Sequence, residues 1–113
     1  MSSTLTSPYR VGEGVVHLTI TVGDGQLGTS TVMLGTERIA SGEAIDVDVG
    51  RGLEITGNVL VCTTAVTDIL PETNHTSVTY DLTGGLQPRK FIQLEDIDPD
   101  GTIVYLAVFT FTQ

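Results

Sequence analysis

Three aspartates alternate along a short stretch near the C-terminal end of the chain, in the order Asp96-Ile97-Asp98-Pro99-Asp100-Gly101. Alternate carboxylates can converge on one hard cation such as Ca²⁺, and a glycine after them permits the sharp bend of a cation-binding loop. Thr102 follows at the position where such a loop offers a backbone carbonyl. The spacing therefore predicts a calcium site with Asp96, Asp98, Asp100 and Thr102 as its ligands.

This acidic turn, residues 96–101, has two interpretations that the sequence leaves open. Its spacing resembles the opening of an EF-hand loop, but a full EF-hand is excluded because Ala107 occupies the position of the bidentate glutamate and no helical pattern flanks the loop. In the second interpretation, Asp98-Pro99-Asp100-Gly101 is an ordinary β-turn with proline and glycine at favoured positions, and its acids are solvated. Calcium is the single cofactor that the sequence suggests.

The other residues that could do chemistry form no catalytic pattern. His17 and His75 are the only histidines, Cys62 is the only cysteine, and Cys62 lies in an apolar segment. The chain has no G-x-S-x-G nucleophile elbow, no phosphate-binding loop and no H-E-x-x-H zinc motif. We therefore predict that the protein is not an enzyme and that it has neither catalytic nor cofactor-binding residues. A small β-fold enzyme of the cupin kind is the least favoured alternative, because its metal would need a histidine cluster.

Short strands must position these residues. In the segment 15–22 apolar residues alternate with polar ones, which is typical of an antiparallel strand with one buried face. The segment 59–67 is apolar on both faces, as expected of an interior strand, and 103–111 is the most apolar segment of the chain. We expect about seven or eight strands in all; the others are predicted at 29–34, 37–40, 43–49, 76–83 and 90–95, with 53–56 as a continuation beyond a glycine turn.

The composition favours an all-β fold. Val occurs 13 times, Ile eight times and Thr 18 times, against four Ala, and β-branched side chains suit a pleated sheet better than a helix. Turn signals recur at the spacing of roughly 8–12 residues that sandwiches show. We therefore predict an antiparallel β-sandwich. In length and strand count it resembles immunoglobulin-like and fibronectin-III-like domains, but the Cys…Trp…Cys pattern of antibody domains is absent, so the resemblance is architectural and carries over no functional residue.

The 113 residues are expected to form one domain over 15–113, preceded by a flexible arm or edge segment over 1–14. A single cysteine allows no intrachain disulfide. No signal peptide or transmembrane segment is recognisable in this form, so a cytoplasmic protein and a mature secreted chain are both compatible with the sequence.

The net charge of −9 disfavours nucleic acid and anionic membranes as partners, since both attract clustered Lys and Arg. The uncharged segment 103–111 must either lie centrally in a sheet or pair with another subunit. We therefore expect a non-catalytic structural or protein-interaction module that self-associates or joins a larger assembly. The alternative is a calcium-stabilised binding domain for a protein or a carbohydrate, although the few aromatic residues give carbohydrate binding weak support.

Overall fold

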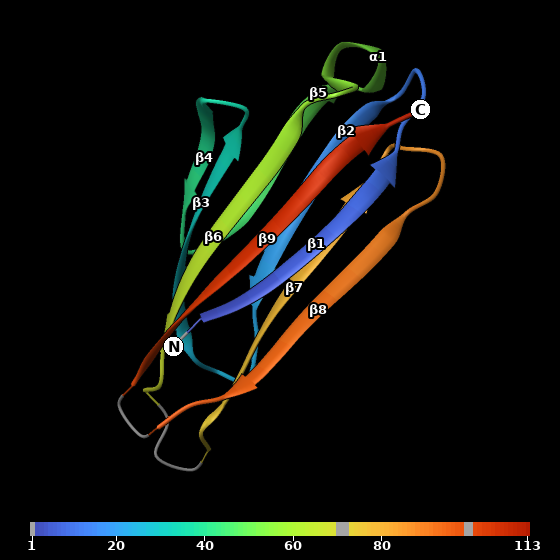
Figure 1. The fold of residues 1–113 in the computed structure, drawn as a ribbon. Helices are drawn as coiled ribbons and strands as arrows, with labels where there is room; N and C mark the ends of the chain where they lie inside the picture. Colours follow the sequence, from blue (N-terminus) through green and yellow to red (C-terminus); the bar gives the residue numbers. More distant parts are fainter. Residues whose placement is uncertain (1, 70–72, 99–100) are drawn as a thin grey trace.

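The computed structural model describes residues 2–69, 73–98 and 101–113 of the chain. Strands dominate this described part, with about 70% of residues in strands and 4% in a helix, which confirms the predicted all-β class. Figure 1 shows the strands as two layers. The elements are β1 (Ser2–Arg10), β2 (Val15–Val22), β3 (Leu27–Leu34), β4 (Glu37–Gly42), β5 (Ile45–Arg51), α1 (Gly52–Ile55), β6 (Val59–Thr67), β7 (His75–Thr83), β8 (Arg89–Asp96) and β9 (Thr102–Thr112).

The strands form a five-stranded sheet in the order β1-β9-β6-β3-β4 and a four-stranded sheet in the order β5-β2-β7-β8. The fold is thus sandwich-like, with nine strands in the described residues where the sequence predicted seven or eight. The prediction of a purely antiparallel fold is wrong for one pair, because β1 runs parallel to β9, with Ser2 beside Val104 and Arg10 beside Thr112. The polar segment 1–14 contains this extra strand, which lies at the edge of its sheet.

One core lies between the two sheets, and the alternation seen in the sequence selects the side chains that fill it. The even-numbered apolar residues of β2 and β7 face inward, and Val16, Leu18, Val78, Tyr80 and Leu82 are fully buried. The facing layer comes mainly from alternate residues of β9, which are Ile103, Tyr105, Ala107, Phe109 and Phe111.

The most apolar strand, β9, lies inside its sheet. It is hydrogen-bonded to β6 on one side and to β1 on the other, so the chain itself covers the edges of the segment 103–111. Unpaired edges of uncharged strands promote association between chains. The central position of β9 therefore removes this segment as a reason for self-association.

The predicted strand at 53–56 is wrong, because Gly52–Ile55 forms the single helical turn α1. The Gly52 N–H donates a hydrogen bond to the Gly14 carbonyl (2.9 Å), and a Cβ added at Gly52 would lie 2.1 Å from the Gly12 carbonyl oxygen. Ile55 is buried whereas Leu53 is exposed, so the two do not share one face of a strand. Contacts with a distant segment, which the local pattern does not encode, set the conformation here. Among the described residues, no helix is long and apolar enough to cross a membrane.

Candidate functional site

The predicted calcium ligands lie where β8 leads into β9. Asp96 is the last residue of β8, and it faces His75, the first residue of β7, in the antiparallel register. The two side chains are in direct contact through His75 Nδ1 and a carboxylate oxygen of Asp96. The hydrogen bond with Asp96 raises the pKa of His75 above its usual 6.5. Asp96 is therefore already paired with the His75 imidazole of the neighbouring strand.

The rest of the acidic turn is described only in part. The Gly101 N–H donates to the Asp98 carbonyl (2.9 Å). Thr102 opens β9, and its hydroxyl lies 3.2 Å from that of Thr67. Asp100 lies outside the described residues, and within them no group of three or more His, Cys, Asp or Glu could hold a metal. The calcium site stays a prediction.

A second cluster, which the sequence reasoning missed, lies on the outer face of the four-stranded sheet. His17 of β2 lies between Asp46 and Asp48 of β5, with its Nδ1 2.7 Å from a carboxylate oxygen of Asp48 and its Nε2 in contact with Asp46. The alternation of Asp46 and Asp48 was the only signal in the sequence. It becomes meaningful once the register pairs His17 with Asp48 and Thr19 with Asp46.

The two carboxylates of this cluster favour the protonated form of the His17 imidazole. The hydrogen bond with Asp48 and the contact with Asp46 raise the pKa of His17 above its usual 6.5, although partial desolvation opposes them. Because both ring nitrogens have carboxylate partners, neither is available to take a proton from a substrate. The cluster instead links β2 to β5 through charged side chains.

The His17 cluster predicts a pH dependence that an NMR titration can measure. A raised folded-state pKa means that the imidazolium stabilises the fold fully below pH 6.5, and that this contribution is lost as the pH rises through the folded pKa. We expect Asp48→Asn to lower the pKa of His17 and to leave that of His75 unchanged, whereas Asp96→Asn should do the reverse. Equal His17 titrations in the wild type and Asp48→Asn would contradict the assignment.

Cys62 is not a nucleophile in this fold. Its side chain lies in the core on β6 with no exposed surface, and burial raises the pKa of the thiol to about 12. The thiolate, which is the reactive form, is therefore negligible at neutral pH.

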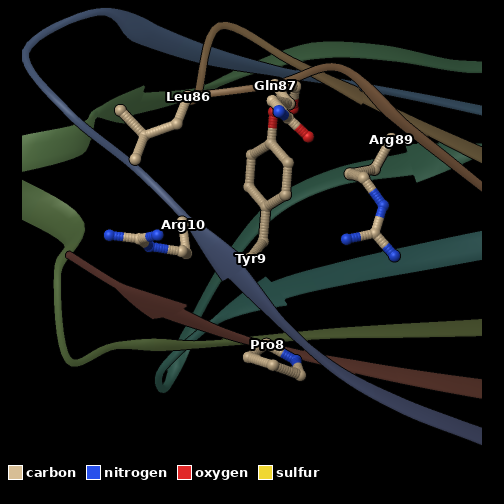
Figure 2. Close-up of a pocket in the computed structure, with 6 residues that line it drawn as sticks. All are labelled: Pro8, Tyr9, Arg10, Leu86, Gln87 and Arg89. Carbon is tan, nitrogen blue, oxygen red and sulfur yellow. The ribbon is translucent and has the colours of Figure 1, made fainter.

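A pocket of about 360 Å³ lies between β1 and the connection from β7 to β8 (Figure 2). Tyr9 rises through it, and its hydroxyl lies 2.8 Å from the Gln87 carbonyl and 3.2 Å from the Leu82 carbonyl while it accepts the Gly85 N–H at 3.1 Å. Figure 2 shows the Arg10 and Arg89 side chains on opposite sides of the Tyr9 ring. Through these hydrogen bonds Tyr9 fastens β1 to the β7–β8 connection.

These features define a two-sheet all-β protein whose histidines are paired with carboxylates and whose cysteine is buried. Comparisons of the chain with protein-family models, with curated proteins and with solved structures found no match.

Proposed function

We propose that this chain is a non-catalytic structural or protein-interaction module that self-associates or joins a larger assembly, with a strand architecture like that of immunoglobulin-like and fibronectin-III-like domains. One observation carries the proposal. Two large apolar side chains, Ile92 and Leu94, project from the outer face of β8 with 55% and 68% of their surface exposed. Apolar side chains that lie together on an open surface are typical of interaction sites.

The surroundings of these two side chains support contact with another protein. In the register of the sheet, Ile92 faces Thr79 and Leu94 faces Ser77, and Thr79 in turn faces Thr21 on β2. Small hydroxyl side chains beside the apolar pair leave a flat surface that a partner can approach closely. The engaged histidines and the buried thiol support a role without catalysis.

Sedimentation velocity over a concentration series from micromolar to millimolar tests the proposal. We expect the weight-average mass to exceed that of the 12.0 kDa monomer and to rise with concentration. A mass that stays at the monomer value across the whole series would contradict self-association.

A further inference from the structure

The two sheets have four edge strands, and three of them carry features that oppose pairing with another chain. β1 contains Pro8, which has no backbone N–H to donate. β4 is short, begins with Glu37 and Arg38, and pairs with β3 through a register shift. β5 presents Asp46 and Asp48 outward, and its pairing with β2 is also irregular. Charges, prolines and irregular pairing are common protections of sheet edges.

The fourth edge strand, β8, has none of these protections in its central part. It is eight residues long, contains no proline and keeps a continuous register with β7 from Arg89 to Asp96. Its central residues Phe91, Ile92, Gln93 and Leu94 are uncharged, and its charges lie at the two ends. In Figure 1, β8 lies at the margin of its sheet.

The free edge of β8 offers a defined set of backbone groups. The Ile97 N–H donates to the Asn74 carbonyl (3.0 Å), and the Glu95 carbonyl accepts from the Thr76 hydroxyl (2.8 Å), so the backbone groups of these two residues face the β7 side. Backbone groups of successive residues in a strand point to opposite sides. The N–H and C=O groups that face away from β7 therefore belong to the even-numbered residues Lys90, Ile92, Leu94 and Asp96.

The side chains of the same four residues project from the outer face of the sheet. Their order is such that, when two copies run in opposite directions, each base faces an acid and each apolar residue faces another apolar residue. Along β8 they read base, apolar, apolar, acid. When a second β8 runs antiparallel with Gln93 at the centre, Lys90 faces Asp96 of the second copy and Ile92 faces Leu94 of the second copy. A shift by two residues in one direction places Lys90 opposite Leu94, and a shift in the other direction places Asp96 opposite Ile92, so both set a charge against an apolar side chain. The match therefore selects one register.

Both charged ends remain accessible to a partner. Lys90 Nζ lies 3.8 Å from Asp81 and Asp96 contacts His75, yet the side chains of Lys90 and Asp96 keep 63% and 72% of their surface exposed. Cross-strand pairs of opposite charge and of apolar residues each contribute roughly 0.2–1 kcal/mol. The net charge of −9 on each copy opposes association, but physiological salt screens charges that are separated by more than about 8 Å.

We propose that β8 pairs antiparallel with β8 of a second copy of this chain, centred on Gln93, so that the two four-stranded sheets become continuous. This inference rests on the proposed function and specifies the partner and the surface. The contact is symmetric, as in most homodimers. One strand and its side chains make an interface below the lower limit of about 1,200 Å² for stable interfaces, so the dimer is weak and depends on concentration.

The first test compares substitutions at two exposed leucines, Leu94 (68% exposed) and Leu53. Leu94→Asp places a carboxylate opposite Ile92 of the second copy, whereas Leu53→Asp makes the same change on α1, where the leucine is 58% exposed. We expect sedimentation analysis to show at least a tenfold weaker dimer for Leu94→Asp and an unchanged dimer for Leu53→Asp. Both leucines lie on the surface, and circular dichroism checks that both variants are folded.

The second test reads the register by disulfide cross-linking. Residues that face each other across an antiparallel pair have Cα atoms about 4.5–5.5 Å apart, which a disulfide can span, whereas the diagonal distance of about 7–8 Å is too long. A mixture of Ile92→Cys and Leu94→Cys chains should therefore form mixed disulfide dimers in preference to either homodimer. Cys62 is buried and should not take part in the exchange.

The outcomes separate this inference from the proposed function. If the wild type self-associates but Leu94→Asp and Leu53→Asp weaken it equally, or the mixed cross-link does not form, the β8 interface is overturned and self-association stands. A wild-type chain that stays monomeric at every concentration overturns both the β8 interface and self-association.

Discussion

Replacement of Phe109 by alanine is expected to lower the free energy of unfolding by about 3–5 kcal/mol, as for other large core aromatic residues. Phe109 has no exposed surface on β9. Its ring centroid lies 5.8 Å from that of Tyr80 on β7 and 5.0 Å from that of Phe91 on β8. The side chain thus connects the five-stranded sheet to the four-stranded sheet, and its removal opens a cavity between the two layers.

Urea denaturation followed by circular dichroism measures this loss. Val108→Ala is the matched control, because Val108 precedes Phe109 on the same strand but points to the other face and is only half-buried. The control should cost much less than the Phe109 variant. Comparable losses for the two variants would show that the packing between the sheets is not centred on Phe109.

The bounds of two strands could be predicted closely from the sequence. Val15–Val22 and Val59–Thr67 have the predicted bounds, because glycine, aspartate or asparagine turns end them and β-branched residues fill them. In β7 the predicted inward residues Val78, Tyr80 and Leu82 are all buried. Local alternation is enough where one face of a strand meets the core and the other meets water.

The two departures from the predicted fold have tertiary causes. β1 has mostly small polar side chains, and it forms a strand because β9 offers its other edge, with Tyr9 buried and fastened to the β7–β8 connection. Gly52–Ile55 forms a helical turn and not a strand because Gly52 lies against the backbone of Gly12 and Gly14. Neither contact is visible in a pattern of neighbouring residues.

The chemistry of the polar residues depended on register in the same way. The sequence showed Asp96 as a member of an acidic series, but the pairing of β7 with β8 gives it His75 as a partner. It showed His17 as a histidine on a polar face, but the pairing of β2 with β5 places it between two carboxylates. The spacing of acids within one segment predicts that their carboxylates converge on a cation. The pairing register between strands, however, determines which charged side chains are in contact.

The turn after β7 provides the second large expected effect, because two backbone segments approach each other very closely at Gly84. Gly84 has φ +86°, a region that favours glycine, and a Cβ added there would lie 1.8 Å from the Val15 carbonyl oxygen. Gly57 has nearly the same φ, +87°, but a Cβ added there would meet no atom within 4 Å. Comparing substitutions at Gly84 and Gly57 therefore separates the cost of the left-handed backbone conformation from the cost of steric overlap with a neighbouring segment.

We expect Gly57→Ala to cost about 1–2 kcal/mol, since only the left-handed conformation of the backbone opposes it. Gly84→Ala should cost more than about 4 kcal/mol or prevent folding, because the turn and the start of β2 must also separate. Circular dichroism of both variants, with urea unfolding of those that fold, measures the difference. Unfolding free energies within about 0.5 kcal/mol of each other would mean that the segments at Gly84 and Val15 can move apart freely. A large difference would show that their close contact holds β2 and the β7–β8 connection together, and with them the sheet that ends in the free edge of β8.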